Sequence, residues 1–375
     1  MNVKNSTNID IKRLNRHNVF RYVYRNEKVS RPEIARALNM SMPTVLQNVK
    51  ELLDCGLIRE IGQFESTGGR KASMLARVPD TRVAVGIDIT RSHIGFVLVN
   101  LTGEILHHKR VSKAFTNSVS YYEELGCLVR EYVESQPYPA EKQLGAGFSI
   151  PGILDEQGLN IVDSHALGLQ NLPCETITRY IPFPCHFMND ANAAGMGESR
   201  WMESGSTMVY LSLSNSVGGA VFIDGKLYKG QNQRSGEFGH MRLVPGGRRC
   251  YCGQNGCVDA YCSALVLVKE MGSQPEDFFS SLESGEKRHK KALDEYCDYL
   301  ALAITNLSMS FDCNVVLGGY IGGYLEPYLP AILDRVRKHS PFEQKGTFLQ
   351  TCRCRLEASA YGAAMQLVEQ FMEEI

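Results

Sequence analysis

The stretch that decides the fold is Gly236-Glu237-Phe238-Gly239-His240, followed a short way on by Cys250-Tyr251-Cys252-Gly253-Gln254-Asn255-Gly256-Cys257. Three closely spaced thiolates and one imidazole can fill the four positions of a tetrahedral zinc site, and the glycines relieve the tight chelating loop. Since no position would stay open for a reacting group, the zinc would be structural. The alternative is a loop with three reduced cysteines, and spacing alone does not fix the histidine as the fourth ligand. The candidate metal ligands are His240, Cys250, Cys252 and Cys257.

Two acid-bearing motifs accompany this loop. Asn189-Asp190-Ala191-Asn192-Ala193 follows an apolar-rich stretch at 185–188, and Glu237 lies close to His240. A carboxylate and a carboxamide at the end of a strand suit a polyol hydroxyl or general-base chemistry. Capping of the following helix explains the first motif equally well. Together the two motifs favour a polar pocket that binds hydroxyl groups.

From residue 82 onward the chain has the alternating pattern of an α/β body. The apolar runs at 83–89 and 95–99 are typical of buried strands, and a third strand begins at Glu104. A helical stretch near 118–135 then precedes another strand at 145–150. This alternation of strands and helices implies an α/β fold.

Two strand-turn-strand segments stand where a nucleotide-binding lobe would hold phosphates. Glycine-rich turns let backbone amides approach a phosphate. Here the first turn reads Asp88-Ile89-Thr90-Arg91-Ser92-His93, without glycine, and the second has Ser214-Asn215-Ser216 at its tightest point. Bulky side chains block a close approach, and non-glycine residues resist positive φ. A further segment, Gly318-Gly319-Tyr320-Ile321-Gly322-Gly323, is either a nucleotide-facing turn or an ordinary glycine-rich loop.

The N-terminal segment has the pattern of a helix-turn-helix. Ser30 and Ser41 stand where helix N-caps are expected, and an apolar face runs along the second helix from Val45 to Leu53. A helix of this kind enters the DNA major groove, where amides can pair with adenine and threonine can touch a thymine methyl. Lys50 would meet phosphate instead. The outward side is expected to carry Thr44, Gln47, Asn48 and Glu51. The DNA-contact candidates on this helix are Ser41, Thr44, Gln47, Asn48 and Lys50.

Two short strands at 57–61 and 73–78 flank a glycine-rich tip with two cations, which is predicted to be a wing. Its Arg70 and Lys71 would reach into a narrow minor groove or lie along phosphates. Residues 1–80 hold 14 Lys and Arg against 8 Asp and Glu, a charge of +6 that leaves −7 for the remainder. A basic N-terminal segment followed by an acidic remainder favours a DNA-binding module at the N-terminus. The alternative is a small dimerisation domain with a charged surface.

A chain of 375 residues is long enough for two or three domains, and 43% hydrophobic with 22% charged residues is a globular composition. It has no long apolar run and no basic-then-apolar N-terminus, so we expect a cytoplasmic protein without membrane contact. In that compartment the 12 cysteines would stay reduced. Those outside the metal loop are expected to fill the core.

These motifs resemble those of the ROK family (repressor, open reading frame, kinase) over residues 13–375. The segments 236–240 and 250–257 resemble the family's zinc signature, 189–192 resembles its sugar-site motif, and the winged helix resembles its repressor branch. The resemblance implies an N-terminal winged helix-turn-helix at 1–80, followed at 81–375 by a two-lobed body that is actin- or hexokinase-like (ribonuclease H-like). Lobe one would take about 81–188 plus the C-terminal helix, and lobe two about 189–355.

The resemblance also assigns the sugar contacts. By motif position these are Asn189, Asp190, Glu237 and His240, with one His240 ring nitrogen on zinc and the other toward a hydroxyl. Asp259 stands where the family usually has a glutamate, so a sugar contact there would reach one methylene less far and sugar preference would differ. Family kinases carry glycine-rich phosphate turns that this chain lacks, although it retains Asp190, their base on the sugar hydroxyl.

We therefore expect a sugar-responsive transcriptional regulator and not an enzyme, most simply a repressor that a free sugar releases from its operator. One rival hypothesis is an ATP-dependent sugar kinase with an appended DNA-binding domain. Another is a zinc-stabilised interaction protein that binds no sugar. The expected partners are operator DNA, a sugar effector and further copies of the chain in a homodimer or homotetramer, and the expected cofactor is structural Zn²⁺.

Overall fold

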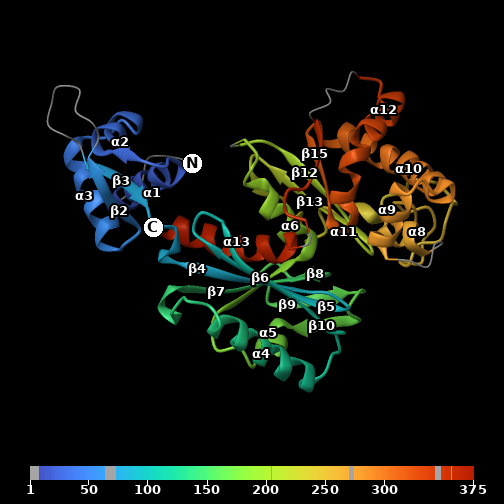
Figure 1. The fold of residues 1–375 in the computed structure, drawn as a ribbon, viewed down its shortest axis with the longest axis horizontal. Coiled ribbons are helices and arrows are strands. Elements are labelled where there is room, and N and C mark those ends of the chain that lie inside the picture. The colour runs from blue at the N-terminus through green and yellow to red at the C-terminus, as the bar shows by residue number, and fades with distance from the viewer. Residues whose placement is uncertain (1–7, 64–72, 204, 270–273, 343–347, 356) are drawn as a thin grey trace.

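The computed structural model describes residues 8–63, 73–203, 205–269, 274–342, 348–355 and 357–375. A small N-terminal module lies beside the end of the C-terminal helix, and the rest of the chain surrounds two five-stranded sheets (Figure 1). The expected α/β fold, a winged helix-turn-helix before a two-sheet body, is confirmed. Within these ranges no helix combines the length and apolar character needed to cross a bilayer.

Three helices and a small sheet form the N-terminal module. They are α1 (Asn8–Arg25), β1 (Val29–Ser30), α2 (Arg31–Ala37), α3 (Met42–Asp54), β2 (Ile58–Gln63) and β3 (Ser73–Arg77), with strand order β1-β3-β2. The expected N-caps are confirmed: Ser30 accepts a hydrogen bond from Glu33 N, and Ser41 from Thr44 N. The antiparallel pair β2–β3 gives the predicted wing strands. The wing tip, with Arg70 and Lys71, lies outside the described residues.

The outward placement of Asn48 on α3 is wrong. Its side chain is only 2% exposed, and its Nδ2 donates to the Thr44 carbonyl at 2.7 Å. Asn48 follows Val45 by three residues and precedes Leu52 by four, which puts it on their buried face. An amide that bonds to its own helix backbone can be buried there. Asn48 therefore packs inside the module and is not placed to read a base.

The first sheet of the body has the order β11-β7-β4-β5-β6. Its strands are β4 (Val83–Ile89), β5 (His93–Asn100), β6 (Ile105–Ser112), β7 (Gln143–Ile150) and β11 (Cys185–Asn189). Apolar side chains of α4 (Val119–Glu134) cover one face and those of α13 (Ala358–Glu374) the other. Close contact with α13 requires two glycines, because a Cβ on Gly86 or Gly147 would lie 1.8 or 2.0 Å from an α13 carbonyl oxygen.

A separate small sheet of order β10-β9-β8 follows β7. Its elements are β8 (Ile153–Leu154), β9 (Asn160–Ser164) and β10 (Leu169–Pro173), with α5 (Cys174–Thr178) after them.

The second five-stranded sheet has the order β14-β13-β12-β15-β16. Its strands are β12 (Met208–Leu213), β13 (Val217–Ile223), β14 (Lys226–Leu227), β15 (Asn314–Gly318) and β16 (Leu349–Thr351). One hydrophobic cluster joins this sheet to the helices that surround it. The helices of this region are α7 (Asp259–Cys262), α8 (Ala264–Lys269), α9 (Pro275–Glu283), α10 (Lys287–Phe311), α11 (Gly319–Gly322) and α12 (Leu329–His339).

Two crossed helices join the sheets. The helix α6 (Asp190–Ser199) packs on β12 and β13 of the second sheet, and it crosses α13, which packs on the first (Figure 1). At the crossing a Cβ on Gly362 would lie 1.6 Å from the Ala193 carbonyl oxygen, so a residue without a Cβ is required. Any change in the angle between the sheets must therefore change the contact between these two helices.

The end of α13 also holds the N-terminal module. Arg21 of α1 pairs with Glu369 of α13 at 3.1 Å, and His17 Nδ1 donates to the Met372 carbonyl at 2.9 Å. Apolar residues of α1 and α13 belong to one hydrophobic cluster. The module thus rests on the helix that crosses α6.

Candidate functional site

A cavity of about 590 Å³ lies between the small sheet, the start of α6 and the second sheet. This volume falls in the range of small-molecule sites. Four of the five predicted sugar contacts line it, namely Asn189, Asp190, Glu237 and His240. The structure also brings His165 and Tyr251 to its wall, which the sequence did not indicate.

Asn189 caps α6 and lines the cavity at once. Its Oδ1 accepts a hydrogen bond from Asn192 N at 3.0 Å, and its Nδ2 donates to the Gly152 carbonyl at 3.0 Å. The capping interpretation of this motif is confirmed. Both ends of the amide are engaged, so the Asn189 side chain is held in one orientation at the cavity wall.

Asp190 is the first residue of α6, and its Oδ1 accepts a hydrogen bond from Ala191 N at 2.9 Å. Burial, with the nearby carboxylates of Asp88 and Glu237, raises the pKa of Asp190 to about 7. A carboxyl group with this pKa exchanges its proton near neutral pH. It can therefore accept a hydrogen bond from a bound hydroxyl or serve as a general base.

Asp88, at the end of β4, was missed as a site residue. Ser149 Oγ donates to Asp88 Oδ1 at 2.8 Å, and burial raises the pKa of Asp88 to about 6. The available signal was a carboxylate near the end of a buried apolar strand. Its main effect on the site is electrostatic, because it opposes ionisation of Asp190.

Glu237 and Asp259 have different surroundings. Burial raises the pKa of Glu237, although the charges of His240 and Arg234 oppose this shift. Asp259 begins α7, is buried, and its Oδ2 accepts a hydrogen bond from Val217 N at 2.7 Å. It is not among the residues that line the cavity. Asp259 thus ties the start of β13 to the helix that follows the metal loop.

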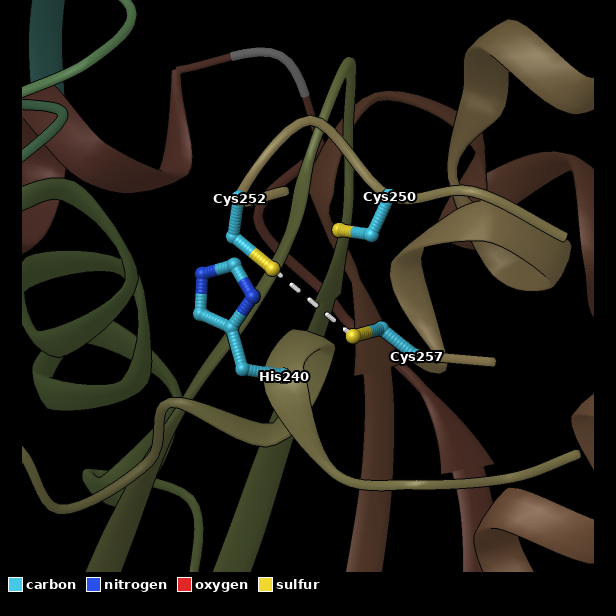
Figure 2. Close-up of side chains that lie close together, drawn as sticks. All are labelled: His240, Cys250, Cys252 and Cys257. Carbon is cyan, nitrogen blue, oxygen red and sulfur yellow. Dashed lines mark hydrogen bonds between the residues drawn. The ribbon is translucent and has the colours of Figure 1, made fainter. Parts of the chain in front are cut away.

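The predicted metal ligands come together at one side of the cavity. The ligand atoms of His240, Cys250, Cys252 and Cys257 all lie within 4.8 Å of one another (Figure 2). The Cys252 and Cys257 sulfurs are 3.8 Å apart, which matches the edge of a tetrahedron with metal–sulfur bonds of about 2.3 Å. Among the described residues, the buried Nδ1 of His240 has no hydrogen-bond partner, and a metal ion would satisfy it. The cluster therefore has the composition and geometry to hold a metal ion.

Two aromatic side chains that line the cavity beside this cluster stack on each other. The ring of His165, which follows β9, stacks on Tyr251 with centroids 4.5 Å apart and planes at 16°. The Tyr251 hydroxyl lies 3.1 Å from His240 Nε2. This is the ring nitrogen that would stay free if a metal ion bound Nδ1. The metal loop therefore touches the small sheet's loop. No sequence pattern predicts this pair, because its partners come from separate parts of the chain.

Hydrogen bonds within the first glycine-free turn occupy three of its backbone donors. Thr90 N donates to the His93 carbonyl at 2.9 Å, while Ser92 N and His93 N donate to Thr90 Oγ1 at 3.4 and 3.0 Å. These N–H groups are not directed at an incoming ligand. The turn is therefore closed by its own side chain and lacks a phosphate cradle.

The second turn is closed in a similar way. Ser214 N donates to the Ser216 carbonyl at 3.2 Å, and Ser214 Oγ accepts a bond from Tyr320 N at 3.1 Å. Gly319 has φ +74°, and a Cβ there would lie 2.5 Å from Leu213 N. Tight packing of the loop after β15 onto the end of β12 thus accounts for this glycine. These contacts fit the interpretation of residues 318–323 as an ordinary glycine-rich loop.

On the N-terminal module, the candidate DNA-contact residues lie along α3. Gln47 and Lys50 are exposed, whereas the Ser41 and Thr44 hydroxyls bond to each other at 2.8 Å at the start of the helix. Lys12 of α1 pairs with Glu51 near the other end of α3 at 2.8 Å. The start of α3 is thus the part whose outward face is available to a partner.

A winged helix-turn-helix joined to a two-sheet body with a polar small-molecule cavity defines a DNA-binding regulator with a ligand-binding domain. Residues 84–370 match the sequence model of the ROK family, and the chain belongs to this family. Residues 13–59 match the model described as winged helix-turn-helix DNA-binding.

Known proteins are similar to this chain over most or nearly all of its length. The xylose repressor of Bacillus subtilis is 24% identical over 97% of both chains, and the DNA-binding transcriptional dual regulator NagC of Escherichia coli is 23% identical over 70% of this chain and 66% of its own. A solved ROK family transcriptional regulator, a homolog of E. coli MLC protein, superposes with a TM-score of 0.78 at 20% identity over 97% of both chains. The ROK hexokinase of Thermus thermophilus gives 0.63 at 24% identity and covers 77% of this chain and 99% of its own.

Proposed function

We propose that this regulator is a repressor that binds operator DNA through its N-terminal module and is released when a free sugar binds in the cavity. The observation that carries the proposal is the contact between α6, α13 and α1. The first residue of α6 is Asp190, in the cavity, and α13 holds the DNA-binding module at its far end. A sugar that changes the angle between the sheets would therefore move the module. Domain boundaries at 1–80 and 81–375 remain part of this proposal.

The cavity has the chemistry of a sugar site. Carboxylates at Asp190 and Glu237 can accept hydrogen bonds from hydroxyl groups, and the Asn189 amide beside them is fixed by its own bonds. Asp259 would act on the sugar through the Val217 backbone, without direct contact.

Effector binding typically changes the affinity of a second site by about 5–150-fold, and we expect operator affinity to change on that scale. Thermal shift against hexoses, pentoses, amino sugars and their 6-phosphates would identify the ligand. A panel without any shift would instead support the interaction protein that binds no sugar.

We expect no ATP-dependent phosphorylation of the bound sugar. In the first turn the backbone N–H groups of Thr90, Ser92 and His93 bond within the turn, and in the second Ser214 N bonds to the Ser216 carbonyl, so neither turn offers these amides to a phosphate. The measurement is a coupled ATPase assay with the same sugar panel. The kinase alternative keeps one favourable observation, the pKa of Asp190 near 7, which suits a general base. A sugar phosphate that appears with ATP and is lost in Asp190→Ala would establish that alternative.

The cluster of His240, Cys250, Cys252 and Cys257 is proposed to hold one structural Zn²⁺. Three sulfurs and one nitrogen are the donor set zinc prefers in closed sites. The metal would fix the loop that carries Tyr251 and, through His240, one wall of the cavity.

We expect the module to bind a pseudo-palindromic operator as a symmetric homodimer or within a homotetramer, because one short helix reads few bases. Gln47→Ala should cost roughly 1–3 kcal/mol at particular base pairs, whereas Lys50→Ala should weaken all sequences alike and lower the salt dependence. Affinities for a set of single-base operator variants at two salt concentrations would separate these effects. Unchanged sequence preference in Gln47→Ala would remove this residue from base readout.

A further inference from the structure

Two apolar side chains face outward at the start of α3. Met42 is 40% and Leu46 is 49% exposed, although both belong to the amphipathic helix whose other face is buried. They are four residues apart, so they lie side by side along the helix. In a helix-turn-helix the first residues of this helix are the ones that reach base edges.

The polar side chains nearest this pair already have partners within the module. The Thr44 hydroxyl is bonded to Ser41 Oγ at 2.8 Å, and Asn48 is buried. Gln47 points along the helix, with Nε2 3.4 Å from Glu51 Oε1. A helix that reads bases only through hydrogen bonds would not need two exposed apolar side chains here.

The charge around the pair favours DNA as its occupant over a second copy of the chain. Residues 1–80 carry a charge of +6, and the exposed Lys50 lies one turn beyond Leu46 on α3. Two modules of this net charge that met here would repel each other, whereas DNA phosphates are attracted to them. The apolar group that a major groove offers is the 5-methyl of thymine.

We propose that Met42 and Leu46 read thymine methyl groups in the operator's major groove, an inference that rests on the proposed operator binding. Each contact buries one methyl group against an apolar side chain. Burial of about 0.8 kcal/mol per methyl-sized group corresponds to about a fourfold change in affinity per thymine.

The test uses the full chain and operator duplexes selected by it from a random library. Each thymine is replaced in turn by deoxyuridine, which lacks only the 5-methyl group, and affinity is measured by fluorescence anisotropy. We expect about a fourfold loss at one or two thymines per half-site with the unmutated protein. In Leu46→Ala or Met42→Ala the loss at the matching thymine should disappear. The control is Leu14→Ala, which shortens a side chain on α1 that is 58% exposed, and it should keep the full deoxyuridine effect.

Three results would overturn the inference. They are operators in which deoxyuridine has no effect at any thymine, full deoxyuridine sensitivity in both α3 variants, and an α3 variant that changes the sedimenting species without changing deoxyuridine sensitivity. The last result would assign the pair to contact between copies. Failure of the unmutated chain to select any DNA would be distinct, because it would remove the proposed operator binding and this inference with it.

Discussion

Cys257→Ser is expected to lose the bound metal and to lower the free energy of unfolding by on the order of 4 kcal/mol, the scale of losing a metal ligand. For a chain of this length that corresponds to about 5 °C in Tm. The reason is local. Cys257 is a buried thiol within 4.8 Å of the other ligand atoms, and the loop it closes carries Tyr251 to the cavity wall. Without the metal, His240 Nδ1 would also stay buried and unsatisfied.

Two further variants separate metal loss from packing. Cys252 is exposed, so destabilisation by Cys252→Ser would come from the lost ligand and not from a buried sulfur. Cys127 lies on α4, is exposed and not in the core as expected, and does not belong to the cluster, so Cys127→Ser should change neither metal content nor Tm. Metal content is measured on protein purified without chelators, and Tm by calorimetry. Well under one zinc per chain in the unmutated protein, or unchanged metal in Cys257→Ser, would contradict the assignment.

Features set by short stretches of sequence could be predicted. A serine before a proline and an acid specifies where α2 begins, and Ser41 does the same for α3, because a cap acts on the next turn alone. The run at Val83–Ile89 identifies a buried strand because both of its faces are covered. The metal cluster follows from ligands close together in sequence, with His240 as the one distant member.

Features that depend on contacts between distant segments could not be predicted. Asn48 was assigned to the outward face because it is polar, yet its bond to the Thr44 carbonyl lets it take a core position that spacing alone would have given it. The stack of His165 on Tyr251 and the contact of α1 with α13 each join segments without a shared pattern. Asp259 was expected in the sugar site from motif position, but its carboxylate bonds to the Val217 backbone.

The second large effect concerns Asp190→Asn, which should abolish the sugar response and yet make the protein more stable at alkaline pH. The folded protein holds the pKa of Asp190 at about 7, above its ordinary value of 3.8. A carboxyl group with a raised folded pKa binds its proton more tightly when folded, so its contribution to stability is present below about pH 4 and is lost as pH rises through about 7. Above that range the ionised side chain is buried near Asp88 and Glu237 and opposes folding.

Asparagine keeps the size of the side chain and removes the charge. At pH 8, Asp190→Asn should therefore have a free energy of unfolding that is roughly 1–3 kcal/mol higher than that of the unmutated protein, and with it a higher Tm. This difference should shrink toward pH 5. Calorimetric scans of both proteins across this pH range measure it. Sugar affinity should fall at least about tenfold, because an amide has one acceptor oxygen where a carboxylate has two, and a sugar hydroxyl that donates to the lost oxygen would stay unpaired. Operator binding without sugar should stay unchanged, since Asp190 lies in the cavity and the DNA-binding module contacts the far end of α13. A variant that is less stable at pH 8 would show that the ionised Asp190 is paired in the folded protein. A variant that still releases the operator on sugar addition would remove Asp190 from the effector site.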